Sequence, residues 1–433
     1  MVTTLVEQAA APLQAATLPP LTSDIPLKTC QVCVVVPVRD EAQHLPVMLG
    51  ALAHQVDHQG QRLNPDSYEV LLLANNCSDG SEAIAAAIGR TYPQLRLHVI
   101  SVDLPQSKAN VGQARQMVMN EAYRRLSQIG LNRRIIASTD GDTEVSPNWL
   151  ASIADEFAQG VDVVCGRILT RRSSEADIHS RTSLYFLRYV GHRYLTAQLE
   201  ACLDPLPHDS WPRHYQHFGA NMAVLADLYG RVGGVPDVKI QEDVALYKKL
   251  QRVDAKIRHS PHVRVLTSAR RIGRTSGGLA ERLNQLTRAS QQHQAVWVES
   301  PHITEARIVV RNQLRQSWTG LKQNCFLPPV QNQVATQRLA QWLGFSEKDI
   351  QEKITTASTF GALIESLTTE QRETLDFHLG QQAMVEISSA NMHLRKRIQT
   401  LRQSPLAERP LDNSAIWESL QQIQPIPLFS LTY

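Results

Sequence analysis

The sequence of 433 residues lacks the features that define several large protein classes. It has no apolar run of the roughly 18 to 20 residues that a bilayer-spanning helix needs, so we expect no transmembrane segment. Its first residues lack a basic start followed by an unbroken apolar core, which argues against a secretory signal. Lys and Arg (44) exceed Asp and Glu (41) by only 3, so no strong positive field points to nucleic acid.

Cysteine is scarce, with six residues in the chain. Cys30 and Cys33 have CxxC spacing, but no second pair accompanies them, so a zinc ribbon is poorly supported. Because they lead into an apolar run, we expect buried thiols and a protein of the reducing cytoplasm. Hydrophobic residues make up 42% of the chain and charged residues 20%, which is typical of a globular protein with a sizeable core.

Apolar, β-branched runs alternate with segments of helical periodicity. The predicted strands cover residues 32–36, 69–74, 95–102 and 134–139, and the predicted helices between them cover 44–54, 81–90 and 110–128. This order predicts βαβ units and a mostly parallel sheet. The loops that follow such strands share one edge of the sheet. Pro37–Glu41, Asn75–Ser81 and Asp140–Asp142 should therefore line one crevice.

The last of these strands ends in Asp140-Gly141-Asp142. Two carboxylates separated by one small residue repel each other unless a cation lies between them, and oxygen ligands suit Mg²⁺ or Mn²⁺. Mg²⁺ is commonly held by carboxylates together with substrate phosphates, so the expected partner is a nucleotide diphosphate. The alternative is an ordinary polar turn, since Asp and Gly are common turn residues.

Two further segments have both a structural and a functional interpretation. Glu242 and Asp243 precede an apolar helical pattern, where carboxylates stabilise a helix N-terminus by roughly 0.3–1 kcal/mol each. Residues 267–278 are basic and rich in glycine, and their arginines could clamp phosphate oxygens or lie on a solvated loop. Residues 279–402 contain amphipathic helices without a catalytic constellation, and such helices usually pack on a neighbouring domain.

Six motifs in this order resemble the family 2 glycosyltransferases of GT-A fold. They are VVVPVRDE (34–41), ANNCSDGS (74–81), ANVGQAR (109–115), STDGDT (138–143), FGANMAV (218–224) and QEDVAL (241–246). The resemblance covers roughly Cys30 to Gly278. It implies an α/β fold with a GT-A-type, mostly parallel sheet flanked by helices, followed by a C-terminal α-helical extension. The implied activity is inverting transfer of a sugar from a nucleotide-diphosphate sugar to a hydroxyl acceptor.

Composition and helical pattern, together with the extent of the resemblance, divide the chain as follows: a loosely ordered leader (1–27), a catalytic domain (28–278), a helical extension (279–402) and an extended tail (403–433). Within the catalytic domain, 28–145 would be the nucleotide-binding half and 146–278 the acceptor-binding half.

The resemblance also implies roles for individual residues. Asp140 and Asp142 correspond to the metal-binding pair, with Mn²⁺ or Mg²⁺ as the cofactor. Asp243 matches the catalytic base, and Glu242 would orient the base or the acceptor, or simply begin the helix. The candidate nucleotide-sugar-binding residues are Pro37, Arg39, Glu41, Asn76, Asp79, Gly112, Arg115, Asp140, Arg270 and Arg271. The candidate acceptor-binding residues are Gly219, Ala220 and Asn221.

The chemistry of sugar transfer agrees with these roles. Breaking the bond to the diphosphate leaves negative charge, which a divalent cation and arginines stabilise. A carboxylate within about 3 Å of the acceptor hydroxyl can take its proton. The family frequency favours a UDP-sugar, but Asn75-Asn76 stands where many relatives have Asp, so the nucleotide base stays open. No QxxRW-type motif follows Asp243, which disfavours processive polymer synthesis across a membrane.

Two other functions are weighed against this one. A sugar nucleotidyltransferase would carry a glycine-rich loop after the first strand, whereas this chain has Pro37-Val-Arg-Asp-Glu41 there, with no glycine. A non-catalytic nucleotide- or carbohydrate-binding module would need neither a metal pair nor a base, yet Asp142 and Asp243 are both present.

Overall fold

The computed structural model describes residues 11–171, 180–268, 278–322, 329–374, 383–403 and 425–430. The chain divides into two compact units. The first contains the described residues within 1–175, 216–251 and 255–284, and the second contains those within 176–215, 252–254 and 285–433. No helix of the described residues combines the length and the apolar character that crossing a bilayer requires.

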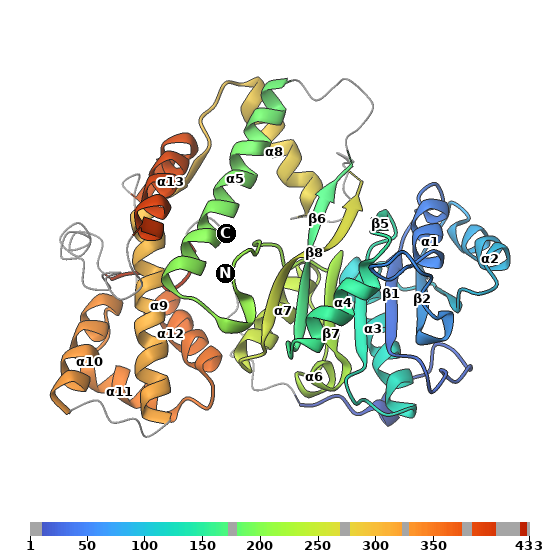
Figure 1. Cartoon of the computed structure of the whole chain (residues 1–433), viewed down its shortest axis with the longest axis horizontal. Coiled ribbons are helices and arrows are strands. Elements are labelled where there is room, and N and C mark those ends of the chain that lie inside the picture. Colours follow the sequence, from blue (N-terminus) through green and yellow to red (C-terminus); the bar gives the residue numbers. More distant parts are fainter. Residues whose placement is uncertain are drawn as a thin grey trace. The chain divides into compact units, whose positions relative to one another are not determined.

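The first unit is a sheet flanked by helices (Figure 1). Its strands are β1 (Val32–Val38), β2 (Tyr68–Asn75), β3 (Leu97–Val102), β4 (Ile135–Thr139), β5 (Thr143–Val145), β6 (Val163–Thr170), β7 (Asn221–Leu225) and β8 (Ile257–Thr267). Its helices are α1 (Leu45–Ala53), α2 (Ser81–Thr91), α3 (Val111–Gln128), α4 (Trp149–Ala158), α6 (Ala226–Arg231) and α7 (Glu242–Arg252). The predicted α/β class with a mostly parallel sheet is confirmed.

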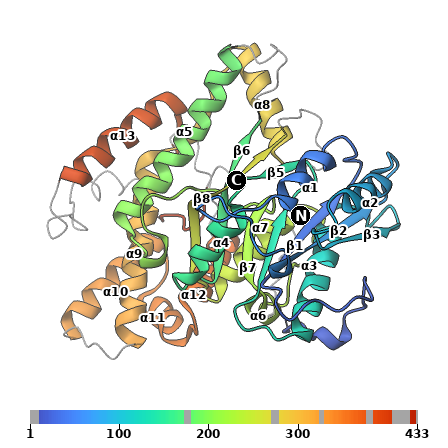
Figure 2. The same cartoon turned by 45° about the vertical axis from the view of Figure 1, so that its right-hand side comes forward.

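The strand order is β3-β2-β1-β4-β7-β6-β8-β5. The first four strands are parallel to one another, and β6 is parallel to β8, whereas β7 runs antiparallel to both β4 and β6. The turned view in Figure 2 shows β1, β2 and β3 side by side. Because β1, β2 and β4 point the same way, the loops that follow them leave the sheet at one edge.

The interior of this unit follows from its apolar runs. Every residue of β1 and of β2 is buried, as continuous apolar strands of a parallel sheet require. Helix α3 packs on both strands. It begins where the side chain of Asn110 accepts a hydrogen bond from the backbone N–H of Gln113 at 2.9 Å. Cys30 and Cys33 are buried free thiols, which confirms that prediction.

Residues 11–27 differ from the expected loosely ordered leader. The backbone N–H of Leu13 donates to Gly230, and the N–H groups of Leu21 and Thr22 donate to the carboxylate of Glu121 on α3. The expectation from composition was wrong for these residues, because buried charges on α3 take their hydrogen-bond partners from this segment.

The second unit is helical. Its elements are α5 (Ser180–Leu203), α9 (Pro301–Lys322), α10 (Pro329–Leu343), α11 (Glu347–Thr356), α12 (Phe360–Thr374) and α13 (Ile387–Gln403), with a small antiparallel pair of β9 (Trp297–Glu299) and β10 (Met384–Glu386). Helix α8 (Leu279–Gln291) lies on the chain segment where the two units meet in sequence.

Helix α5 belongs to this unit, although the sequence assigned it to the acceptor-binding half of the catalytic domain. Its residues Leu199 and Leu203 share an apolar cluster with α9 and α13. The carboxylate of Asp204, directly after α5, pairs with Arg311 and Arg315 of α9. Ile426 of the expected tail is fully buried among α10 and α12. The domain boundaries themselves stay a prediction.

Candidate active site

The loops after β1 and β2 are tied to each other by side-chain to backbone hydrogen bonds. The backbone N–H of Ser78 donates to Asp40 at 2.7 Å, and that of Ala42 donates to Asp79 at 2.8 Å. The N–H of Glu41 donates to the hydroxyl of Ser81 at 2.9 Å. The predicted convergence of these loops at one edge is confirmed.

The Asp-Gly-Asp turn after β4 lies against the same loops. A Cβ on Gly141 would lie 3.0 Å from Cγ2 of Val38 and 3.1 Å from Cγ of Glu41, so glycine allows the close approach. The carboxylate of Asp142 accepts hydrogen bonds from the hydroxyls of Thr143 at 3.3 Å and Thr267 at 3.4 Å. Thr267 ends β8, so the turn is held between β1 and β8.

Arg115 of α3 connects this turn to α7. Its Nη2 donates to Oδ1 of Asp140 at 2.7 Å, and its Nε donates to Oε1 of Glu242 at 3.0 Å. Its Nη1 donates to the hydroxyl of Ser138 at 2.6 Å and to the carbonyl of Gly219 at 3.1 Å. The guanidinium is thus a junction of four chain segments that lie far apart in the sequence.

The carboxylates around Arg115 stabilise the positive charge of its guanidinium. Only 4% of Arg115 is exposed, and burial by itself would lower the pKa of the guanidinium. The negative charges of Asp140, Glu242 and Asp243 outweigh burial and raise that pKa. Arg115 is therefore a permanent buried cation surrounded by carboxylates.

Asp243 lies beside this junction at the start of α7. Its Oδ2 accepts a hydrogen bond from the backbone N–H of Gly219 at 2.7 Å, and its Oδ1 accepts one from Val244 at 2.8 Å. Burial and the neighbouring charge of Glu242 raise the pKa of the Asp243 carboxyl, and Arg115 and the two backbone bonds offset only part of that rise. A carboxylate whose pKa is raised is a stronger proton acceptor than an ordinary aspartate.

Aromatic residues neighbour, along the chain, the two segments that meet at Asp243, and they were not predicted from the sequence. Tyr247, one helical turn after Asp243, stacks on His217 with ring centroids 4.2 Å apart, and its hydroxyl lies 3.3 Å from Nε2 of His259. Phe218 is next to His217 and is 38% exposed. The signal was available: an aromatic residue four positions after a helix-starting acid shares its face.

Asp140 and Asp142 fit a hard divalent cation by the chemistry of their donor atoms. Both supply carboxylate oxygens, which Mg²⁺ and Mn²⁺ prefer. The side chain of Asp140 is 34% exposed although Arg115 binds one of its oxygens. Two buried side-chain oxygens lie at the ends of β2 and β4 and have no hydrogen-bond partner among the described residues. They are Oδ1 of Asn75 and Oγ1 of Thr139. Buried polar atoms nearly always have partners, so these two are consistent with a ligand-binding edge.

Another cluster of potential ligands has a structural explanation. Asp40, Cys77 and Asp79 offer ligand atoms within 4.8 Å of one another, and they form the one such trio within the described ranges. Their atoms already bind the two loops together: Asp40 accepts from Ser78, Asp79 accepts from Ala42 and Ser81, and Cys77 accepts from the N–H of Asp40.

Several predicted nucleotide-binding residues also shape the loops. Pro37 is buried within β1 rather than in the loop that follows it. Arg39 donates to the carbonyl of Ala109 at 2.7 Å. The amide of Asn76 makes two hydrogen bonds to the backbone of Leu104. Their part in nucleotide binding stays a prediction, and so does that of Glu41 and Asp79.

The predicted acceptor-binding residues do not behave alike. Gly219 contacts Asp243 and Arg115 through its backbone, and the neighbouring Ala220 is half-buried. Asn221 differs, because its side chain is buried and bonds to Trp149 and to two backbone carbonyls. Its amide is thus engaged within the fold. Arg270 and Arg271 lie outside the described residues.

Comparison with known proteins identifies a similar family. Residues 33–219 match the model of "Glycosyl transferase family 2". No curated protein is significantly similar to the chain in sequence.

Three solved structures illustrate the range of structural likeness. The chain shares 15% identity with the mannosyltransferase PcManGT from Pyrobaculum calidifontis in complex with GDP-Man and Mn²⁺ (TM-score 0.38; 89% of this chain and 87% of that one covered). It shares 12% identity with S. aureus TarS 1-349 in complex with UDP (TM-score 0.40; 91% and 92%). It shares 15% identity with the glucosyl-3-phosphoglycerate synthase from Mycobacterium tuberculosis (TM-score 0.32; 63% and 84%). Likenesses this low carry no assignment of donor or acceptor.

The match to the family model covers the loops after β1 and β2, the Asp-Gly-Asp turn and Gly219, and it ends before α7. The segment from residue 33 to residue 219, less than half of the chain, is thus similar to glycosyl transferase family 2.

Proposed function

We propose that this enzyme transfers a sugar from a nucleotide-diphosphate sugar, with a UDP-sugar as the favoured donor, to a hydroxyl acceptor with inversion at the anomeric carbon. One observation carries the proposal. Arg115 hydrogen-bonds both Asp140, after β4, and Glu242, next to Asp243. This contact supports the proposal because it links one proposed metal ligand to the residue beside the proposed base, although about a hundred residues separate them in the sequence.

The residues divide the reaction between them. Asp243 accepts the proton of the acceptor hydroxyl, and the hydroxyl oxygen attacks the anomeric carbon from the face opposite the diphosphate. The bond from that carbon to the diphosphate breaks as the new glycosidic bond forms, so the configuration inverts. Because the pKa of Asp243 is raised, its carboxylate is suited to take the proton.

Asp140 and Asp142 would hold Mn²⁺ or Mg²⁺, whose positive charge stabilises the departing diphosphate. The two hydroxyls that donate to Asp142, from Thr143 and Thr267, hold its carboxylate in place. Arg115 holds Asp140 in the same way. These contacts fix the carboxylates before any ligand binds, and that lowers the cost of assembling the site.

Two variants separate binding from chemistry. Thermal unfolding with UDP or GDP, each with and without Mn²⁺, reports nucleotide binding, because a ligand of the native state raises its stability. We expect Asp142→Ala to lose the Mn²⁺-dependent shift. We expect Asp243→Asn to keep that shift and to release UDP from UDP-glucose or UDP-N-acetylglucosamine on the order of 10²–10⁴ times more slowly. Full turnover in the Asp243→Asn variant would refute the base assignment.

A further inference from the structure

We propose that Arg115 is a positioning residue, which keeps the metal-side carboxylate and the base-side helix in register, and that it does not bind the donor phosphates. The inference rests on the proposed function and changes the role that the resemblance gave to this arginine.

The hydrogen bonds of Arg115 leave little capacity for a ligand. A guanidinium has five N–H groups and no acceptor. Four hydrogen bonds already run from Arg115 to Asp140, Glu242, Ser138 and Gly219, and each of its three nitrogens takes part. The side chain is 5% exposed. A phosphate-binding arginine needs a guanidinium face that an anion can reach, whereas this one is enclosed by protein acceptors.

The surrounding chain is shaped to hold the guanidinium at this depth. A Cβ on Gly219 would lie 2.5 Å from Cζ of Arg115, so any side chain there would displace the guanidinium. A Cβ on Gly112, one turn before Arg115, would lie 2.6 Å from the carbonyl oxygen of Val238 and 3.3 Å from Cβ of Glu242. Gly112 thus permits the close approach of α3 to the segment that leads into α7, and Gly219 leaves room for the guanidinium beside the segment that leads into β7.

The charges explain what the arginine achieves. Without the guanidinium of Arg115, three negative charges would repel one another, those of Asp140, Glu242 and Asp243. The buried positive charge of Arg115 offsets that repulsion. Glu242 and Arg115 are the charged side chains that act on Asp243, with opposite effects on its pKa. Arg115 donates hydrogen bonds to Glu242 and to the carbonyl of Gly219. It therefore fixes the start of α7, which carries Asp243, and the segment whose backbone N–H binds Asp243.

The planar shape of the guanidinium is essential to this role. Lysine keeps the positive charge, but its single ammonium cannot match the fork-shaped set of acceptors that arginine reaches. Arg115→Lys therefore preserves the charge and disturbs the geometry. A displacement of the reacting groups by about 1 Å can reduce turnover on the order of 100-fold even where substrate binding is retained.

The test compares Arg115→Lys with Arg125→Lys, a second buried arginine of the same helix that lies outside the site. For each variant and the parent, the measurements are thermal unfolding, affinity for UDP at saturating Mn²⁺, and the pH profile of UDP release from UDP-glucose and UDP-N-acetylglucosamine. For folded Arg115→Lys we expect UDP affinity within about threefold of the parent and turnover lower by roughly 10- to 100-fold. Arg125→Lys should lose thermal stability and keep turnover.

Arg115→Met adds a readout that a merely structural arginine would not move. Without the cation, Glu242 acts on Asp243 unopposed, so the acid limb of the pH profile should move to higher pH. Should Arg115→Met not fold, Arg115→Met combined with Glu242→Gln removes both charges together, and the Arg115→Lys comparison stands by itself.

Three outcomes would overturn the inference. A fall in UDP affinity as large as the fall in turnover would make Arg115 a donor ligand. Unchanged turnover in folded Arg115→Lys would make it structural only. A parent enzyme that binds neither UDP nor GDP with Mn²⁺ and releases no UDP would overturn the proposed function, and the inference with it. That result is distinguishable because it appears in the parent.

Discussion

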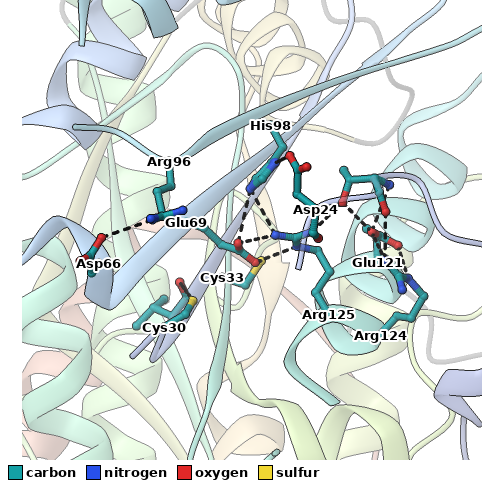
Figure 3. A network of polar contacts seen from close by, with 12 residues as sticks. Asp24, Cys30, Cys33, Asp66, Glu69, Arg96, His98, Glu121, Arg124 and Arg125 are labelled. Carbon is teal, nitrogen blue, oxygen red and sulfur yellow. Dashed lines mark hydrogen bonds and ion pairs between the residues drawn. The ribbon is translucent and has the colours of Figure 1, made fainter. Parts of the chain in front are cut away.

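Each end of α3 carries a buried arginine that pairs with carboxylates, but the two arginines have different roles. Arg115 lies near the start of the helix and Arg125 near its end, ten residues and about 15 Å apart along the axis. Each is a buried arginine bonded to carboxylates from other segments. Arg125 binds Glu69 of β2 through two hydrogen bonds of 2.9 and 2.6 Å, and it also contacts His98 and the N-terminal residues Thr22 and Asp24 (Figure 3).

The carboxylates at the two ends are in opposite states. Burial alone would raise the pKa of Glu69, but hydrogen bonds from Arg125 and His98, together with their charges, lower it to about 2. The pKa of Asp243 is raised instead. Glu69 is thus held as an anion that the fold needs, whereas Asp243 is held ready to take a proton. The difference lies in the contacts: Arg125 donates to both carboxylate oxygens of Glu69 through Nε and Nη2, whereas the carboxylate of Asp243 accepts hydrogen bonds from the backbone N–H groups of Gly219 and Val244.

The largest expected effect is a loss of folding stability at the end of α3 that carries Arg125. Arg125→Met leaves Glu69 buried without its main partner, which should lower the free energy of unfolding by about 3–5 kcal/mol. Chemical denaturation measures the loss. UDP release per folded molecule should not change below the unfolding transition. Replacing Glu69 with Leu in the same chain removes the stranded charge and should recover most of the stability, and failure to recover it would contradict the ion-pair explanation.

Lowering the pH should destabilise the protein through Glu69, which lies at the same end of α3. The pKa of Glu69 in the folded protein is about 2, below its ordinary value of 4.5, so its contribution to stability is present above pH 4.5 and is lost as the pH falls toward 2. The loss is on the order of 2–3 kcal/mol. Denaturant unfolding between pH 6 and pH 3 measures it, and Glu69→Gln should be less stable at pH 6 with a flatter pH dependence.

A glycine substitution near each end sharpens the contrast. A Cβ on Gly219 would lie 2.5 Å from Cζ of Arg115, and a Cβ on Gly230 would lie 2.5 Å from the ring of Tyr123 on α3. Gly219→Ala should lower turnover by roughly 10- to 100-fold through displacement of the guanidinium. Gly230→Ala should cost about 1–3 kcal/mol of stability through overpacking and leave turnover unchanged. Equal losses of turnover in both folded variants would remove the distinction between the two ends.

The smallest expected effect is at Ser138. Its hydroxyl accepts a hydrogen bond of 2.6 Å from Nη1 of Arg115, and Ser138→Ala removes that acceptor while three others remain. A typical hydrogen bond contributes about 0.5–1.5 kcal/mol, so turnover should fall by only a few-fold. Steady-state UDP release compared with Arg115→Lys measures the effect. A loss as large as that of Arg115→Lys would show that Ser138 acts by itself.

The four strands and three helices predicted at the start of the first unit could be recognised because their signals are local. The apolar run 32–36 lies within β1, and the periodic segment 110–128 corresponds to Asn110 and α3. The leader and α5 were assigned differently by the structure, because their partners lie far away in the sequence. Composition at residues 11–27 cannot reveal that Glu121 and Arg125 require hydrogen-bond partners from them.

The sequence by itself determined which residue types meet the chemistry of sugar transfer: an Asp-Gly-Asp turn after a buried strand, and Glu242-Asp243 at a helix start. Periodicity and turn composition suffice for that, since both depend on neighbours in the chain. Only the tertiary structure decided that Arg115 joins these two acidic segments, that Gly219 bonds to Asp243, and that the amides of Asn76 and Asn221 are used within the fold. A hydrogen bond depends on the position of two atoms in space, and no local pattern specifies the partner of a side chain more than a hundred residues away.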